Sequence, residues 1–91
     1  MEIDLEKLEQ EVRQCSKCNL CKNRTNTVFG DGNKNAEIMF IGEGPGAEED
    51  KEGIPFVGRA GKLMNMAFQG LGINREDVYI CNVVKCRPPN N

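Results

Sequence analysis

Apolar residues near the N-terminus recur at the spacing of a helix. Leu5, Leu8 and Val12 fall on one helical face, and Asp4 stands where an N-cap residue is needed. We therefore expect a helix over residues 4 to about 14. The remaining positions of this segment are polar or charged, and half of them are acidic, so the predicted helix is amphipathic.

Two short apolar runs further along the chain predict strands. Residues 37–41 (EIMFI) end at Gly42 and predict a buried strand, and residues 78–84 are rich in β-branched side chains. Between them, apolar residues keep helical spacing from Ala60 to Gly70, where a glycine favours the end of the helix. The order strand, helix, strand is that of a right-handed βαβ unit with an additional N-terminal helix.

Glycine, proline and small polar residues mark the predicted connections. Residues 30–33 (GDGN) predict a turn, residues 42–58 predict a long acidic loop interrupted by two prolines, and residues 74–77 predict a short capped turn. Two strands cannot form a well-covered parallel sheet. We therefore expect further strands to follow residue 91.

The composition bounds the size and the compartment of the protein. Ninety-one residues suffice for one small domain, and a formal net charge of -2 argues against a protein that coats nucleic acid. No apolar stretch reaches the length of a membrane span, and the acidic N-terminus is unlike a signal peptide. We therefore expect a cytoplasmic protein whose five cysteines serve metal or cluster binding rather than disulfides.

Three cysteines are distributed as in a metal or cluster site. Cys15 and Cys18 form a CxxC pair after the first helix, and Cys86 directly follows the second strand. Zinc and iron–sulfur sites both need four ligands, and the spacing does not distinguish them. Cys21 is a candidate fourth ligand, whereas Cys81 lies within the second strand and is expected to be buried and inert. A reduced, unligated CxxC pair is the simpler alternative.

The glycine-rich segment after the first strand has the position of a phosphate-binding loop but not its residues. Residues 42–46 (GEGPG) lack a Gly-Lys-Ser/Thr ending, and Ala47 stands where the dinucleotide fingerprint has its third glycine. Four acidic residues follow within residues 48–52, where a phosphate would need donors and positive charge. Acidic side chains there could position a water molecule or stabilise a developing cation. The alternative is an acidic loop that is simply exposed to solvent.

Four motifs together give a specific resemblance. They are the CxxC pair at residues 15–18, VFGDGN at residues 28–33, GEGPGAEEDKEGIPFVGRAG at residues 42–61 and NVVKCRPP at residues 82–89. In this order and at these separations they resemble the family-four uracil-DNA glycosylases, the iron–sulfur type of thermophiles. The resemblance implies a three-layer α/β/α fold, of which residues 1–91 would be the N-terminal βαβ portion of a single domain, with the C-terminal half absent.

The resemblance also implies an activity, a cofactor and a set of site residues. Members of the family hydrolyse the N-glycosidic bond of deoxyuridine in DNA, for base-excision repair, and carry a structural [4Fe–4S] cluster. Cys15, Cys18 and Cys86 match three of the four cluster cysteines of the family. The base and water site would be formed by Gly42, Glu43, Gly44, Phe56 and Asn82.

These side chains suit the recognition of a uracil that has been taken out of the DNA stack. Phe56 offers an aromatic face for stacking, and Asn82 offers one donor and one acceptor to the O4 and N3–H edge of uracil. The bond breaks through an oxocarbenium-like state, so Glu43 or Glu49 is expected to order a water or stabilise the cation. Simple packing by Phe56 and backbone capping by Asn82 are the alternative roles.

Parts of the family pattern are missing from this chain. It contains no histidine, so the family's His-Pro segment is absent, and the fourth cluster cysteine would follow residue 91 unless Cys21 replaces it. We therefore expect the 91-residue chain alone to be a poor glycosylase or an inactive one. The alternative from another class is a non-catalytic zinc or iron–sulfur module that binds DNA, and a nucleotide-binding βαβ unit is disfavoured by the acidic run.

Overall fold

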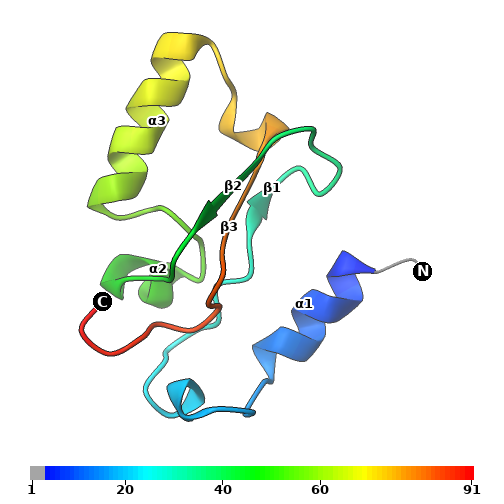
Figure 1. Cartoon of the computed structure of the whole chain (residues 1–91), viewed down its shortest axis with the longest axis vertical. Coiled ribbons are helices and arrows are strands. Elements are labelled where there is room, and N and C mark those ends of the chain that lie inside the picture. Colours follow the sequence, from blue (N-terminus) through cyan, green and yellow to red (C-terminus); the bar gives the residue numbers. More distant parts are fainter. Residues whose placement is uncertain (1–3) are drawn as a thin grey trace.

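A three-stranded sheet organises residues 4–91, the part of the chain that the computed structural model describes. Its strands are β1 (Asp31–Gly32), β2 (Met39–Gly42) and β3 (Tyr79–Asn82), in the order β1-β3-β2. β2 runs parallel to β3, and β1 runs antiparallel to it. The predicted α/β class and the parallel strand pair are thereby confirmed, in a sheet that is mixed (Figure 1).

The connection between the two parallel strands contains the helix α3 (Arg59–Leu71), which is followed by the short 3-10 helix η2 (Arg75–Asp77). The predicted helix is confirmed, but its end is two residues later than expected. Gly70 lies inside α3, and the helix ends at Gly72, whose φ of 71° is the left-handed conformation of a glycine C-cap.

The core lies between α3 and the sheet. Phe68 of α3 packs with Val78 and Ile80, and its ring centroid is 5.1 Å from that of Phe40 on β2. Phe56, from the loop before α3, packs against the edge of this cluster. α3 therefore runs alongside β2 and β3 in Figure 1, and the core anchors the loop that carries the candidate stacking residue.

The expectation of a loop throughout residues 42–58 is wrong, because the helix α2 (Ala47–Glu52) forms within it. The acidic residues of its first turn complement the positive end of the helix, and Gly53, with a φ of 75°, ends it. The acidic run that argued against phosphate binding is thus the signal that begins a helix.

Residues 30–33 form more than the predicted turn. Asp31 and Gly32 pair with Ile80 and Tyr79, which adds β1 to the free edge of β3. A Cβ at Gly32 would lie 2.0 Å from the carbonyl oxygen of Val78, so glycine is required for this close approach. A strand of two residues depends on its partner strand and leaves no periodic pattern in the sequence.

The prediction that the first strand is buried is wrong for β2. Met39 and Ile41 are 55% and 62% exposed, whereas every residue of β3 is buried. β2 lies at the edge of the sheet, and its alternate side chains face solvent. Its hydrophobic run therefore reflects one partly buried face, which contains Phe40, rather than two buried faces.

The N-terminal helix α1 (Leu5–Arg13) forms as predicted. The side chain of Asp4 accepts hydrogen bonds from the backbone N–H groups of Glu6 (3.1 Å) and Lys7 (3.3 Å), as an N-cap does. α1 lies apart from α3 in Figure 1 and leads to the cysteine loop, which contains the 3-10 helix η1 (Asn19–Lys22). None of the described helices has the length and apolar character needed to cross a membrane.

Candidate functional site

The carboxyl ends of the parallel strands bring an aromatic ring and an amide together. Gly42, the last residue of β2, pairs in register with Asn82, the last residue of β3. A Cβ at Gly42 would lie 2.4 Å from Asn82 Oδ1 and 2.5 Å from Phe56 Cζ. Both side chains therefore converge over Gly42, and any larger residue there would displace them.

A hollow of about 220 Å³ opens beside this pair. Phe56 and Asn82 line it together with Gly44, Glu49 and Asn91. The Asn91 Nδ2 group donates to the carbonyl oxygens of Gly44 (3.1 Å) and Pro45 (2.9 Å), which closes the hollow from the C-terminal side. The structure thus gathers four of the predicted site residues around one opening and adds Asn91, which the sequence patterns did not indicate.

The Asn82 side chain is buried yet free to bind. Asn82 is 3% exposed, and within residues 4–91 its amide makes no hydrogen bond to another side chain or to the backbone. Every fully enclosed side-chain nitrogen or oxygen in the described residues has a partner, so the amide of Asn82 retains contact with the hollow. A buried amide left without a partner is unfavourable, which makes it available to a ligand with complementary groups.

Glu49 holds the loop around the hollow. Its Oε1 accepts a hydrogen bond from the N–H of Gly46 (2.9 Å), and its Oε2 accepts from those of Val57 (2.9 Å) and Gly58 (2.7 Å). Burial acts to raise the pKa of Glu49, but the hydrogen bonds led by that from Gly58 outweigh it, so the pKa lies below its ordinary value of 4.5. The carboxylate is charged at neutral pH and is occupied by backbone donors.

Glu43 is exposed and is not among the residues that line the hollow. The carbonyl oxygens of Gly42 and Glu43 accept hydrogen bonds from the N–H groups of Val83 (2.9 Å) and Val84 (3.0 Å). The backbone of Glu43 is therefore fixed beside the segment that follows β3, while its carboxylate faces solvent. Among the described residues this carboxylate neither lines the hollow nor forms a hydrogen bond to Asn82.

The backbone of Phe56 has a conformation that is unusual for its residue type. Its φ is 53°, in the left-handed region, where side chains other than glycine are strained. The guanidinium of Arg75 donates a hydrogen bond of 3.1 Å to the carbonyl oxygen of Phe56. Sequence reasoning missed Arg75, because a contact between a side chain and a distant carbonyl leaves no motif.

The cysteines gather partly around one arginine. Arg24 Nη1 donates to the sulfur of Cys86 (3.2 Å) and to the carbonyl oxygen of Cys15 (2.7 Å). The hydrogen bond to Cys86 and the charges of Cys86, Cys21 and Cys15 raise the pKa of Arg24 above its ordinary value. Cys81 is buried, as expected.

Cysteine sulfur is a suitable ligand for a soft metal or a cluster, but the cysteines do not converge on a common coordination centre in the described residues. Cys18 is exposed, and in residues 4–91 no three cysteine, aspartate, glutamate or histidine side chains are placed to hold a metal ion. Arg24 nevertheless contacts both parts of the chain that carry candidate ligands, through the sulfur of Cys86 (3.2 Å) and the carbonyl oxygen of Cys15 (2.7 Å). Thiolate sulfur is the donor type that zinc and iron–sulfur clusters prefer.

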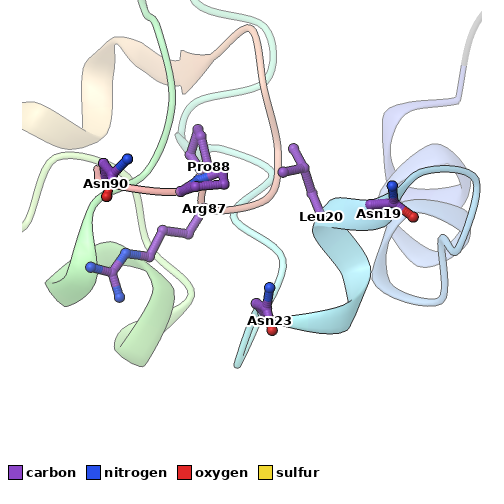
Figure 2. A pocket seen from close by; sticks show the side chains of 7 residues that line it. Asn19, Leu20, Asn23, Arg87, Pro88 and Asn90 are labelled. Carbon is purple, nitrogen blue, oxygen red and sulfur yellow. The ribbon is translucent and has the colours of Figure 1, made fainter.

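A second hollow, of about 340 Å³, lies between the cysteine loop and the C-terminal segment. Figure 2 shows Asn19, Leu20 and Asn23 on the side of the cysteine loop and Arg87 and Pro88 on the other. Arg87 Nε donates to the carbonyl oxygen of Asn91 (2.6 Å), so the guanidinium holds the segment that also closes the first hollow.

The aromatic ring of Phe56 and the unpaired amide of Asn82 meet beside the carboxyl ends of the parallel strands, an arrangement that suits the binding of a planar, hydrogen-bonding group. The chain belongs to the uracil DNA glycosylase superfamily, whose family model matches residues 29–91. It is 60% identical over 87 residues to the type-4 uracil-DNA glycosylase of Thermotoga maritima and 60% identical over 88 residues to that of Sulfurisphaera tokodaii. The type-4 enzyme of Archaeoglobus fulgidus is 55% identical over 87 residues.

These comparisons confirm the family indicated by the motifs. The alignments cover 96% of this chain but 45%, 40% and 44% of the three relatives. The chain thus spans less than half the length of the curated relatives that it matches.

Proposed function

We propose that this chain supplies the base-binding part of a uracil-DNA glycosylase, which hydrolyses the N-glycosidic bond of deoxyuridine in DNA during base-excision repair. The observation that carries the proposal is the amide of Asn82, 3% exposed and without a hydrogen-bond partner in the described residues, beside the ring of Phe56. The membership of the chain in the superfamily supports the choice of uracil as the base.

In the proposed complex, the flipped uracil enters the hollow and stacks on Phe56. Such stacking contributes about 1–3 kcal/mol per base. The amide of Asn82 donates to O4 of uracil and accepts from N3–H. Cytosine presents an amino donor and a ring acceptor at the same edge, so one orientation of the amide cannot satisfy both bases, and the mismatch leaves buried polar groups unpaired.

We assign the two candidate carboxylates to different roles. The carboxylate of Glu49 already accepts hydrogen bonds from three backbone N–H groups, which favours the role of holding the loop. Within residues 4–91 the side chain of Glu43 makes neither a hydrogen bond nor an ion pair, and it stands at the same strand end as the hollow. Glu43 is therefore the better candidate for ordering the attacking water or stabilising the positive charge on the sugar.

We further propose that Cys15, Cys18 and Cys86 bind a [4Fe–4S] cluster, with Cys21 as the candidate fourth ligand within this chain and zinc as the alternative metal. The cluster would supply a structural cross-link between the cysteine loop and the segment after β3. Arg24 supports the assignment because its guanidinium offsets the negative charge that thiolate ligands bring together. In this proposal the cluster takes no part in binding the base, which is assigned to Phe56 and Asn82, or in ordering the water, which is assigned to Glu43.

The test is the release of uracil from a labelled oligonucleotide that contains one deoxyuridine. We would compare the 91-residue chain with a chimera in which it replaces the matching segment of the Thermotoga maritima enzyme. We expect the chimera to release uracil, and Asn82→Ala to reduce release by about 10²–10³-fold, as the loss of one key hydrogen-bonding group does. Asn91→Ala, which removes an amide at the rim, is the matched control.

Two results would count against the proposal. A chimera that binds DNA without releasing uracil would favour a non-catalytic DNA-binding module. An active chimera in which Asn82→Ala and Asn91→Ala lose activity equally would show that the buried amide does not read the base.

A further inference from the structure

The ring of Phe56 occupies its position at the cost of backbone strain. A φ of 53° places Phe56 in the left-handed region, which a residue with a Cβ adopts only at a cost in free energy. Such a conformation persists only where surrounding contacts enforce it. The contacts of the Pro55-Phe56 segment are therefore part of how the ring is placed.

Arg75 makes those contacts with both carbonyl groups of the strained segment. Its Nη2 donates to the carbonyl oxygen of Pro55, and its Nη1 donates to that of Phe56 at 3.1 Å. Two side chains hold the guanidinium in turn, because Nε donates to Asp31 Oδ2 (3.1 Å) and Nη1 to Asn65 Oδ1 (3.0 Å). One arginine thus links β1, α3 and the loop before α3.

The first turn of α3 encloses the same peptide from another direction. A Cβ at Gly61 would lie 1.8 Å from the carbonyl oxygen of Phe56. That oxygen therefore packs closely against Gly61 and also accepts the hydrogen bond from Arg75. With the carbonyl group held, the ring of Phe56 extends to Gly42. There its Cζ and Asn82 Oδ1 both lie close to the place that a Cβ of residue 42 would occupy.

We propose that Arg75 is a positioning residue of the base site, which holds the ring of Phe56 at the stacking distance without touching the substrate. The inference rests on the proposed function of the hollow. Arginine suits the task because its planar guanidinium directs several N–H groups at once, whereas a lysine ammonium is a compact group with three donors. Lysine at this position would reach one carbonyl group but not the whole set of partners.

The first experiment follows the ring itself and requires no enzymatic activity. We would incorporate fluorophenylalanine, assign the Phe56 resonance with Phe56→Leu, and record fluorine spectra of the 91-residue chain and of the chimera. Arg75→Gln and Arg75→Lys are expected to shift and broaden the Phe56 resonance. Arg13→Gln, which removes an exposed arginine from α1, is the matched control and should leave it unchanged. An unmoved Phe56 resonance in Arg75→Gln would overturn the inference.

The second experiment tests whether Arg75 acts through the ring. In the active chimera, Arg75→Gln is expected to lower kcat/KM for uracil release by roughly 10–100-fold, as displacements of about 1 Å do. In a Phe56→Ala background the same substitution should change kcat/KM by no more than about twofold, because the group that it positions is gone. Equal losses in both backgrounds would show a general structural role and overturn the inference.

The two experiments separate the inference from the proposed function. If the chimera releases no uracil, or if Phe56→Ala leaves release unchanged, the proposed function fails. The fluorine spectra then still decide whether Arg75 fixes the ring. Asp31→Asn refines the result, because it weakens one partner of the guanidinium and should give a smaller shift than Arg75→Gln.

Discussion

Substitution of Glu49 by glutamine is the most direct test of how the loop around the hollow is held. The carboxylate of Glu49 joins the start of α2 to the backbone before α3, through N–H groups of Gly46, Val57 and Gly58. Glutamine has the same shape, but its NH2 group must face at least one of these N–H donors. One hydrogen bond is then lost, and the other two are made to a neutral acceptor.

The size of the effect follows from these three bonds. Hydrogen bonds to a charged acceptor contribute about 1.5–3 kcal/mol each and neutral ones about 0.5–1.5 kcal/mol. With allowance for the water that reaches a half-buried carboxylate, Glu49→Gln should lower the free energy of unfolding by about 2–4 kcal/mol. This is a large part of the stability of a small domain.

The contribution of Glu49 to the free energy of unfolding should depend on pH. Because the folded state lowers the pKa of Glu49 below 4.5, the carboxylate stabilises the fold fully above pH 4.5 and loses that contribution as the pH falls through the lowered pKa. Denaturant titrations over this range should show the fall in the original chain. The Glu49→Gln variant should lack this component of the fall.

The matched control is Glu48→Gln, which removes the same charge from the same turn of α2 at an exposed position. Equal unfolding free energies for the two variants would refute the reasoning. A Glu49→Gln chimera that keeps its stability but loses kcat alone would instead assign Glu49 a role in contact with the substrate.

Three further predictions concern single residues. Tyr79 is the only tyrosine, and burial, followed by nearby negative charges, raises the pKa of its hydroxyl. A spectroscopic titration should therefore give a midpoint above 10.0 in the folded chain and 10.0 in denaturant. The neutral hydroxyl stabilises the fold fully below pH 10.0, and this contribution is lost as the pH rises through the raised pKa. Gly42→Ala should destabilise the chain by about 1–3 kcal/mol through overpacking and should abolish stacking on Phe56. Gly70→Ala, where a Cβ would have no neighbour within 4 Å, should stabilise α3 by about 0.5–1 kcal/mol. Denaturant unfolding tests both changes in stability, and a uracil-release assay tests the loss of stacking. Exposed Cys18 should react with a thiol reagent well before buried Cys81, and mass spectrometry of the modified peptides would detect the reverse order.

The periodic elements could be predicted from the sequence, and the elements that depend on contacts could not. α1 and α3 each have a hydrophobic repeat and the parallel strands each have an apolar run, and these elements formed where the patterns predicted them. α2 was missed because glycine and proline on both sides of a short acidic segment are equally typical of a loop. β1 exists because the edge of β3 offers a partner, which no local pattern records.

The same distinction applies to the site. Phe56 and Asn82 could be assigned to one site because their motifs resemble those of a known family, and their chemical roles remain proposals. The arrangement around them could not be predicted. The contacts of Glu49 and Arg75 go mainly to backbone groups of the loops, and every residue type supplies those groups. The motif identifies the residues, while their task depends on distances that only the fold fixes.

The number of residues in α2 is constrained because two neighbouring acidic residues, Glu49 and Asp50, bind different loops. Glu49 faces the loop of the hollow, while Asp50, 5% exposed, accepts hydrogen bonds from the N–H groups of Thr25 (2.8 Å) and Asn26 (3.2 Å), just beyond the cysteine loop. Consecutive residues of a helix point about 100° apart, which lets one turn bind two separate loops. A single inserted or deleted residue would rotate both carboxylates away from their partners at once. Substitutions on the outer surface of α2 should therefore be tolerated far better than any change in its number of residues.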